Sequence, residues 1–193
     1  MRQLLFFSNN KNKIIEIKKI FKKFNLKILS LSDLNISDEP KENGHNFEEN
    51  AKIKSDYGFN KTGFACFADD SGICIESLNW KPGVLSKGFL NSFKSNDSCF
   101  DSIIKSTKKN NKQNAYFKTS ISLTVKNNQN LIFNGKINGK ISEQAKGRFG
   151  FGYDPIFIPK NYNKTLAELG TKEKNEISHR AIAVTKLINF LTN

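Results

Sequence analysis

The sequence predicts an α/β fold with a mixed β-sheet, because segments with strand-like and helix-like apolar patterns alternate along the chain. The first three segments show this alternation. Gln3–Phe7 is an apolar run typical of a strand, Asn12–Phe24 repeats isoleucine and phenylalanine at helical spacing, and Lys27–Leu31 is a second short strand. This β-α-β opening is the first observation behind the predicted class.

The middle of the chain predicts two helices with two strands between them. Phe47–Phe59 has a helical pattern, and so does Cys99–Lys108. Gly63–Ala68 and Ile73–Ser77 are apolar enough for buried strands. The acidic residues that separate these two strands are expected to form a turn.

The last part of the chain predicts a pair of long strands and a closing helix. Tyr116–Lys126 alternates in part between apolar and polar residues, and Leu131–Ile141 is expected to pair with it across Asn127-Asn128. Ser178–Leu191 has the apolar spacing of an amphipathic helix. The polar stretch Lys108–Asn114 is expected to be a loop and not a domain linker.

Length and composition predict one compact globular domain, residues 1–193. A chain of 193 residues with 37% hydrophobic content is long enough for one substantial core and too short for two domains of comfortable size. No apolar run approaches the length of a membrane span, and the first residues lack the layout of a signal peptide, so we expect a cytoplasmic protein with no membrane partner. The three cysteines lack CxxC spacing and are expected to be reduced thiols.

The formal net charge of +13 raises the question of nucleic-acid binding. The lysines are spread through the chain and form no long basic block, so we expect no specific nucleic-acid partner. Binding by charge alone stays an alternative, and it would be sequence-independent and steeply salt-dependent.

The segment FADDSG, Phe67–Gly72, carries the strongest local sign of chemistry. Ionised carboxylates are costly to bury unless a cation, a donor or a substrate compensates them, so Asp69 and Asp70 at the end of a buried strand indicate a divalent metal site. An Asp-rich turn, in which Asp70 and Ser71 accept from backbone amides, explains the same residues. The segment alone leaves both interpretations open.

The segment SNNKNK, Ser8–Lys13, joins the first predicted strand to the first predicted helix. Amides at a helix start and the positive end of the helix dipole favour an anion there, and Lys11 and Lys13 add positive charge. Serine and asparagine are also ordinary helix caps, and the GxxxxGK[ST] pattern of a P-loop is missing. Taken alone, the segment favours a cap over a phosphate site.

Two later segments combine aromatic and basic residues. GRFGFGYDP, Gly147–Pro155, brings glycines and aromatic rings into one turn, which suits stacking on a nucleobase and also suits core packing. In KNEISHRA, Lys174 precedes the closing helix, and His179 and Arg180 lie in its first turn. Cations there oppose the helix dipole, so we expect them to face an anion or a polar ligand.

Seven segments, in their order along the chain, resemble the inosine triphosphate pyrophosphatase family and span nearly the whole sequence. They are SNNKNKIIE (8–16), ENGHNFEENAKIKS (42–55), ADDSG (68–72), PGV (82–84), GFGYDPIF (150–157), TLAEL (165–169) and ISHRA (177–181). The resemblance implies an elongated mixed β-sheet flanked by helices, two lobes with a central substrate cleft, and a homodimer. It also implies Mg²⁺-dependent hydrolysis of noncanonical purine nucleoside triphosphates, namely ITP, dITP and XTP, to the monophosphate and pyrophosphate, which removes them from the nucleotide pool.

The same resemblance implies a role for each matching residue. Asp70 would be the catalytic proton acceptor, and Glu42 and Asp70, assisted by Asp69, would bind the metal. The substrate-binding residues would be Ser8, Asn9, Asn10, Lys11, Asn12 and Lys13 for the triphosphate, Ser71 for a further contact, and Phe151, Gly152, Tyr153, Asp154, Lys174, His179 and Arg180 for the base. Arg180 and backbone amides would donate hydrogen bonds to the 6-oxo group of hypoxanthine. The 6-amino group of ATP is itself a donor, so it could not accept these hydrogen bonds.

The chain departs from the family pattern in three places, one of which, Ser8 in place of the commoner threonine, keeps the hydroxyl. Bacterial relatives commonly have an arginine where this chain has Lys87, so Lys87 is the candidate for that contact. The acidic pair expected in the second motif has Lys41 in its first position, which favours Glu42 as the metal ligand and leaves Glu39 as a spare.

Three alternatives stay open at this point. A septum-formation-inhibitor-like pyrophosphatase would act on dTTP or UTP, although the ISHRA and GFGYDP segments argue against it. A basic nucleic-acid-binding module would tolerate Asp70→Asn, and a catalytically silent nucleotide sensor would bind ITP without turnover.

Overall fold

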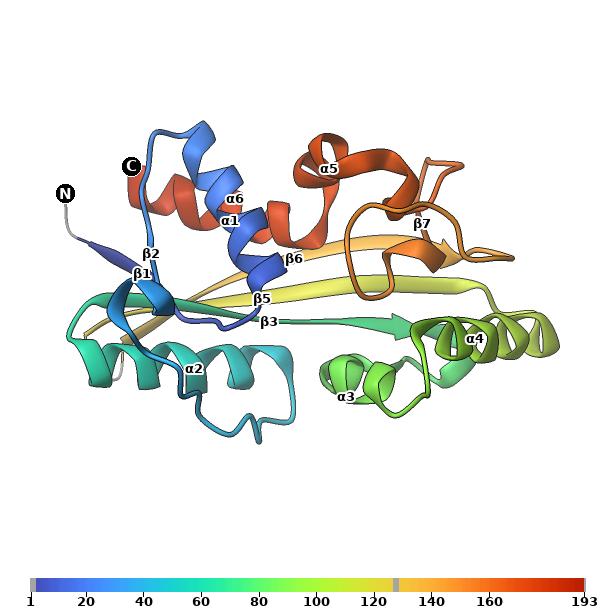
Figure 1. Ribbon diagram of the computed structural model, residues 1–193, viewed down its shortest axis with the longest axis horizontal. Coiled ribbons are helices and arrows are strands. Elements are labelled where there is room, and N and C mark those ends of the chain that lie inside the picture. Colours follow the sequence, from blue (N-terminus) through green and yellow to red (C-terminus); the bar gives the residue numbers. More distant parts are fainter. Residues whose placement is uncertain (1–2, 127–128, 193) are drawn as a thin grey trace. The chain divides into compact units, whose positions relative to one another are not determined.

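The computed structural model describes residues 3–126 and 129–192, which form helices and β-strands (Figure 1). Their contacts divide the chain into two compact units. Unit 1 comprises Met1–Asp70, Thr119–Gly135 and Arg180–Asn193, and unit 2 comprises Ser71–Lys118 and Lys136–His179. Each unit has hydrophobic core residues of its own.

Within the described residues, seven strands form a mixed sheet in the order β2 (Leu29–Ser30), β1 (Leu4–Phe6), β3 (Ala65–Ile75), β5 (Asn114–Lys126), β6 (Gln129–Ile141) and β7 (Phe157–Pro159), with β4 (Lys81–Pro82) paired to β3. Helices flank the strands, so the predicted α/β class with a mixed sheet is confirmed. No helix in this part of the chain is long and apolar enough to cross a membrane.

Unit 1 begins with the predicted β-α-β arrangement. β1 (Leu4–Phe6) pairs in parallel with β2 (Leu29–Ser30) and with β3 (Ala65–Ile75), and α1 (Lys11–Lys23) connects β1 to β2. The helix predicted at Asn12–Phe24 therefore exists and starts one residue earlier.

Side chains alternate along β1 and β3, so unit 1 has a core on each face of these strands. On the face of α1 and α6 (His179–Thr192), Phe67 stacks on Phe6 and Phe21 with ring centroids 4.9 and 5.5 Å apart. The opposite face packs against α2 (Phe47–Thr62), which places Tyr57 and Phe59 against Phe7 and its neighbours. Figure 1 shows α1 and α6 on one side of these strands and α2 on the other.

β3 overturns one prediction, because it runs unbroken through Asp69, Asp70 and Ser71, where a turn was expected between Gly63–Ala68 and Ile73–Ser77. Side-chain alternation directs Asp69 to the face of α1 and α6 and Asp70 to the face of α2. Each carboxylate finds polar partners on its own face, so a chain reversal is not needed to satisfy it.

Unit 2 contains two antiparallel strand pairs at its described residues: β4 pairs with β3, and β7 pairs with β6, where Gly139 lies opposite Pro159. Its core joins Phe117 and Phe157, whose rings meet edge to face at 4.8 Å. The further elements are β4 (Lys81–Pro82), α3 (Ser86–Asn91), α4 (Asn96–Asn110), β5 (Asn114–Lys126), β6 (Gln129–Ile141), β7 (Phe157–Pro159) and α5 (Leu166–Ile177).

Most of the predicted boundaries are close to those observed. α4 covers Cys99–Lys108 and continues to Asn110, so the loop predicted at Lys108–Asn114 is shorter than expected. The predicted turn at Asn127-Asn128 lies outside the described residues. The elements β4, α3, β7 and α5 were not predicted, because three of them are very short and α5 is interrupted at Gly170, where φ is 78°.

Candidate active site

The predicted functional residues fall into two groups, one in each unit. Arg180 is the only member of the predicted base-binding group that belongs to unit 1. Unit 1 holds Ser8, Asn9, Asn10, Lys11, Asn12, Lys13, Glu42, Asp69, Asp70 and Arg180. Unit 2 holds Ser71, Phe151, Gly152, Tyr153, Asp154, Lys174 and His179.

The segment between β1 and α1 is a helix cap, as the residues alone favoured. Asn10 is the N-cap, and its Oδ1 accepts hydrogen bonds from the amides of Asn12 and Lys13 at 3.1 and 3.2 Å. The buried hydroxyl of Ser8 accepts from the amide of Asn10 at 3.2 Å. The first turn of α1 contains no acidic residue, so the positive end of its dipole is not neutralised by its own side chains.

On the face of α1 and α6, four charged side chains are linked by ion pairs, and three of them, Asp69, Arg180 and Glu16, are buried. Lys13 Nζ lies 3.0 Å from Asp69 Oδ2, and Arg180 Nε lies 3.4 Å from the same oxygen. Arg180 Nη1 donates to Glu16 Oε2 at 2.6 Å. Burial lowers the pKa of Lys13, although Asp69 opposes this effect. Two carboxylates therefore hold the guanidinium of Arg180 in place, and Glu16 is a member of the site that the sequence did not reveal.

On the face of α2, an amide side chain holds the predicted catalytic carboxylate. Asn50 Nδ2 donates to Asp70 Oδ2 at 3.1 Å, and Asn50 Oδ1 accepts from the amide of Gly44 at 2.8 Å. Asn50 thereby links Asp70 to the loop that carries Glu42. Burial raises the pKa of Asp70, against the lowering effect of Lys54 and Lys13.

Lys54 is a buried cation one helical turn after Asn50 on α2. It was not among the residues predicted for the site. Its Nζ lies 3.0 Å from Glu42 Oε2, and its side chain is 7% exposed. Burial alone would lower the pKa of Lys54, but Asp70, Asp69 and Glu42 outweigh it and raise the pKa. A signal was available, because Asn50 and Lys54 interrupt the packed face of α2 at a spacing of four residues.

The carboxylates of unit 1 could form a Mg²⁺ site that has two carboxylate ligands. In the described part of the chain, no three His, Cys, Asp or Glu side chains gather as a metal site. Asp69 Oδ2 pairs with Lys13 and Arg180 on the face opposite Asp70, and its predicted assistance at the metal stays a prediction. Mg²⁺ is usually held by one or two carboxylates together with substrate phosphates, and Glu42 and Asp70 match that donor set. Glu39 accepts from the amide of Asn9 at 2.8 Å, whereas Glu42 lies in the loop that Asn50 links to Asp70, so Glu42 stays the predicted ligand.

In unit 2, an ion pair fixes the glycine-rich turn. Lys174 Nζ lies 2.6 Å from Asp154 Oδ2, and each side chain is 3% exposed. The same oxygen accepts from the amide of Phe151 at 2.8 Å, and Lys174 Nζ lies 4.6 Å from the centroid of the Phe151 ring. Gly150 has φ +83°, and a Cβ there would lie 2.0 Å from Asp154 Oδ2. The turn thus depends on glycine at a position where only a residue without a side chain fits.

Two of the predicted base-binding side chains belong to the core of unit 2. Tyr153 is buried, and its hydroxyl donates to the carbonyl of Ser86 at 2.7 Å, so it is a core residue, one of the readings the sequence left open. The ring of His179 stacks on Phe117 at 4.6 Å with an interplanar angle of 7°. Phe151 and Ser71 are half-buried, and Lys87 is exposed on α3.

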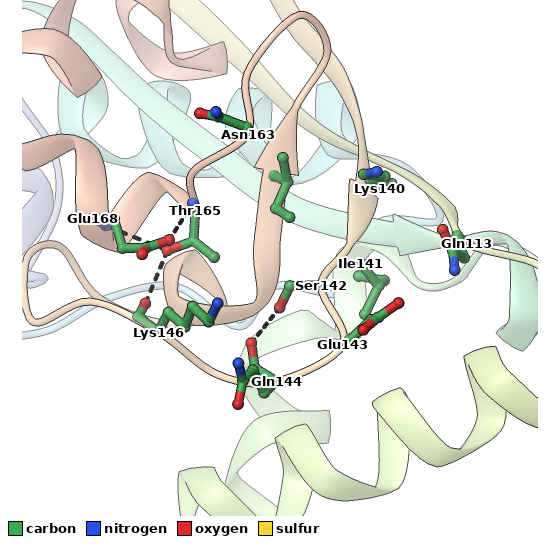
Figure 2. A pocket seen from close by; sticks show the side chains of 11 residues that line it. Gln113, Lys140, Ile141, Ser142, Glu143, Gln144, Lys146, Asn163, Thr165 and Glu168 are labelled. Carbon is green, nitrogen blue, oxygen red and sulfur yellow. Dashed lines mark hydrogen bonds between the residues drawn. The ribbon is translucent and has the colours of Figure 1, made fainter.

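Two hollows in unit 2 are lined by other residues. Figure 2 shows the smaller one, about 210 Å³, where the Thr165 hydroxyl donates to the carbonyl of Lys146 and the Thr165 amide donates to Glu168. The larger one, about 660 Å³, lies over β5, β6 and β7. None of the predicted catalytic, metal or substrate residues lines either hollow.

A buried carboxylate with lysines close by is an arrangement typical of enzymes that act on anionic substrates. The family is shown by sequence, because the model of the Ham1 family matches residues 4–190. The chain belongs to the Ham1 family. This agrees with the resemblance seen in the seven sequence segments.

Relatives match the chain along its whole length. It is 42% identical over 190 residues to a dITP/XTP pyrophosphatase of Christiangramia forsetii, covering 98% of this chain and 99% of the relative. It is 34% identical over 193 residues to the dITP/XTP pyrophosphatase of Bacillus subtilis, covering 99% and 98%. A solved HAM1 protein from Coxiella burnetii has a TM-score of 0.88 and 31% identity, covering 100% of this chain and 99% of that one.

Proposed function

We propose that this protein is a pyrophosphohydrolase that converts dITP, ITP and XTP to the monophosphate and pyrophosphate. The observation that carries the proposal is the buried carboxylate Asp70, oriented by Asn50 beside Lys54, in a chain whose full-length relatives are named dITP/XTP pyrophosphatases. A role in removing these nucleotides before their incorporation into DNA or RNA follows from that chemistry.

The residues of unit 1 supply the groups that hydrolysis needs. Asp70 accepts a proton from water as the water oxygen bonds to phosphorus, and the bond from phosphorus to the bridging oxygen breaks, so that pyrophosphate leaves. Burial raises the pKa of Asp70, and a bound Mg²⁺ would oppose this shift and favour the ionised form that accepts the proton. Lys13, Lys54 and the start of α1 neutralise the polyphosphate, which is most of what such a reaction requires.

We assign Mg²⁺ binding to Glu42 and Asp70, where the ion would neutralise charge on the phosphate oxygens. The pair Glu42 and Glu39 offers a matched test of this assignment. Glu42→Gln is expected to raise the Mg²⁺ concentration needed for half-maximal ITP turnover, and Glu39→Gln is expected to leave it near the wild-type value. The reverse result would move the ligand to Glu39.

Base recognition is proposed for two sets of residues: in unit 2 the Phe151–Asp154 turn with Ser71, Lys174 and His179, and in unit 1 Arg180. Support comes from the Asp154–Lys174 pair, which fixes the backbone of the turn, and from the two carboxylates that hold the guanidinium of Arg180. Fixed donors favour the 6-oxo group of hypoxanthine or xanthine and disfavour the 6-amino group of ATP. Arg180→Ala should therefore narrow the preference for ITP over ATP.

We further propose that both units form one pyrophosphatase domain, since the family match covers residues 4–190 and hence parts of both. A homodimer, a cytoplasmic location and the absence of a sequence-specific nucleic-acid partner complete the proposal. Sedimentation of the full chain tests the dimer directly.

The deciding experiment is pyrophosphate release from ITP, dITP, XTP, dTTP, ATP and GTP, each with and without Mg²⁺. Wild type is expected to release it from the first three substrates only when Mg²⁺ is present, and Asp70→Asn is expected to remove that release. Preferential release from dTTP would favour the septum-formation-inhibitor-like alternative. ITP binding without any release would favour a sensor.

A further inference from the structure

The larger hollow of unit 2 lies on a sheet face whose residues play no part in the proposed reaction. Side chains alternate on its strands, so Phe117 and Phe157 enter the core of unit 2 while their neighbours Tyr116 and Ile158 line the hollow. Lys136 on β6 lines it as well. The hollow has a volume of about 660 Å³, and every lining residue comes from a strand or a turn.

Aromatic rings form one wall of this groove. Trp80 is 46% exposed, and its ring lies 5.5 Å from Tyr116 with an interplanar angle of 32°. Lys136 Nζ lies 3.9 Å from the centroid of the same Tyr116 ring. Tyr116 is therefore covered by Lys136 and Trp80, and Trp80 forms the exposed end of the stack.

The backbone at Trp80 adds an independent observation. Its φ is +63°, in the left-handed region that a bulky aromatic residue rarely adopts. Such strain persists where the surrounding structure or a function requires it. Here the strained backbone leaves the large apolar ring of Trp80 half exposed beside Tyr116, so the fold gains little burial energy in return for the strain.

Three lysines also line the groove: Lys136 and Lys140 on β6, and Lys160 directly after β7. The amide of Lys160 donates to the carbonyl of Asn138 at 2.8 Å, so Lys160 lies between the two β6 lysines along the strand. Four residues of strand separate Lys136 from Lys140 by about 13 Å. None of the described residues that line the groove carries a carboxylate.

We propose that this groove binds single-stranded nucleic acid independently of sequence, with a base stacked on Trp80 and phosphates paired with Lys136, Lys140 and Lys160. Stacking aromatics beside a row of cations is the usual chemistry of such sites. Cations whose backbone positions spread over about 13 Å suit several successive phosphates better than a single monophosphate. A second copy of the chain on the same face would oppose these lysines with identical lysines, which like-charge repulsion disfavours.

Three of the positive charges that contribute to the net charge of +13 lie in this groove. The proposal agrees with the expectation that no specific nucleic acid is bound, because stacking and phosphate contacts do not read base edges. It is independent of the pyrophosphatase proposal, because none of its residues was placed in that site.

The sole tryptophan of the chain is Trp80, so its fluorescence reports on the groove directly. Titration of the full chain with oligothymidylate, in EDTA and without any nucleoside triphosphate, is expected to quench this emission. Anisotropy of a labelled oligothymidylate then compares variants. Trp80→Ala is expected to weaken binding by about 10-fold, the usual loss for one stacked base.

Two triple variants with equal charge change separate the groove from general basicity. Lys136→Gln/Lys140→Gln/Lys160→Gln is expected to lower the slope of log affinity against log salt by about 2, the value for three lost phosphate contacts on a single strand. Lys19→Gln/Lys22→Gln/Lys27→Gln changes three exposed lysines of unit 1 and should stay close to wild type. ITP hydrolysis should be unchanged in both triple variants.

Trp80→Asn guards against a loss that merely reflects misfolding. Asparagine accepts the left-handed backbone, so this variant is expected to raise Tm by about 2–4 °C while it weakens oligonucleotide binding as Trp80→Ala does. Three results would overturn the proposal: no quenching of Trp80, equal weakening in both triple variants, or thymidine monophosphate bound as tightly as the oligonucleotide. A dimer that dissociates in Trp80→Ala and shows no oligonucleotide binding would instead assign the groove to a second copy.

Discussion

The two faces of β3 in unit 1 treat adjacent carboxylates in opposite ways. Asp69 is 1% exposed and meets two cations, Lys13 at 3.0 Å and Arg180 at 3.4 Å. Asp70 is 6% exposed, accepts from the neutral amide of Asn50, and has a pKa raised by burial. The same residue type becomes an ion-pair anchor on one face and a candidate base on the other, because its neighbours decide which protonation state is favoured.

The largest expected effect comes from exchanging each aspartate for asparagine. Asp70→Asn should reduce ITP turnover by about 1,000-fold, the range for loss of a general base, with little loss of stability. Asp69→Asn should lower the free energy of unfolding by about 3 kcal/mol, because it leaves two buried cations with one carboxylate fewer. Steady-state kinetics and urea unfolding of both variants measure this crossed pattern. Equal effects on stability would remove the distinction between the faces.

A smaller effect is expected from Asn50, which positions Asp70 and does not touch substrate in the proposed mechanism. Asn50→Ala should lower kcat by about 10- to 100-fold while KM for ITP changes little, as for other residues that orient a catalytic group. Asn46→Ala is the matched control, because Asn46 caps the same helix and its side chain accepts from the amide of Glu49. It should cost about 1 kcal/mol of stability and leave kcat unchanged when the protein is folded. A similar kcat loss in both variants would mean that Asn50 acts through the stability of α2.

This comparison also shows how far the sequence could lead. The α/β class and the main helices followed from apolar periodicity, and the proposed role of Asp70 came from a motif that is local in sequence. The split between Asp69 and Asp70 did not, because it depends on whether the chain turns or stays extended at that point. DDSG has good turn residues, yet strand pairing prevailed over local turn preference.

The partners of these carboxylates were hidden for a different reason. Glu16 reaches Arg180 across 164 positions in sequence, and Arg180 reaches Asp69 across 111. Such pairs are set by the packing of α1 and α6 on β3, and no local pattern reports them. Lys54 and Asn50 were more accessible, since two polar residues on the packed face of a helix already call for buried partners.

The packing of α2 on the Asp70 face can be tested without touching a charge. A Cβ on Gly58 would lie 2.4 Å from Cys66 Sγ and 2.6 Å from Phe7 Cδ2, so α2 sits at this distance from the sheet only because residue 58 is glycine. Gly58→Ala should therefore destabilise the protein by about 1–3 kcal/mol despite its better helix propensity. Gly63→Ala is not a suitable control, because Gly63 has φ +71°. Gly88→Ala on α3 meets no atom within 4 Å, and thermal unfolding should show it to be neutral or stabilising.

The smallest expected effect concerns Asp33, a carboxylate that is partly exposed to solvent. Asp33 is 43% exposed in its side chain and accepts from the hydroxyl and the amide of Ser30 at 2.6 and 2.8 Å. These bonds, with help from Lys18, hold the pKa of Asp33 below its ordinary value. A carboxylate with a lowered folded pKa contributes stability above its unfolded pKa, near about 4, and loses that contribution as pH falls through the folded value.

Asp33→Asn should consequently flatten the fall in unfolding free energy between about pH 5 and pH 2, while it changes stability at neutral pH only slightly, since exposed charges are screened. Urea unfolding across this pH range measures the slope. Asp101→Asn, at an exposed position of α4, is the control for removing one negative charge. If both variants flatten the curve equally, then net charge, and not the hydrogen bonds from Ser30, sets the acid response. An exposed carboxylate such as Asp33 would then differ from the buried Asp69 and Asp70 in having no specific effect on stability.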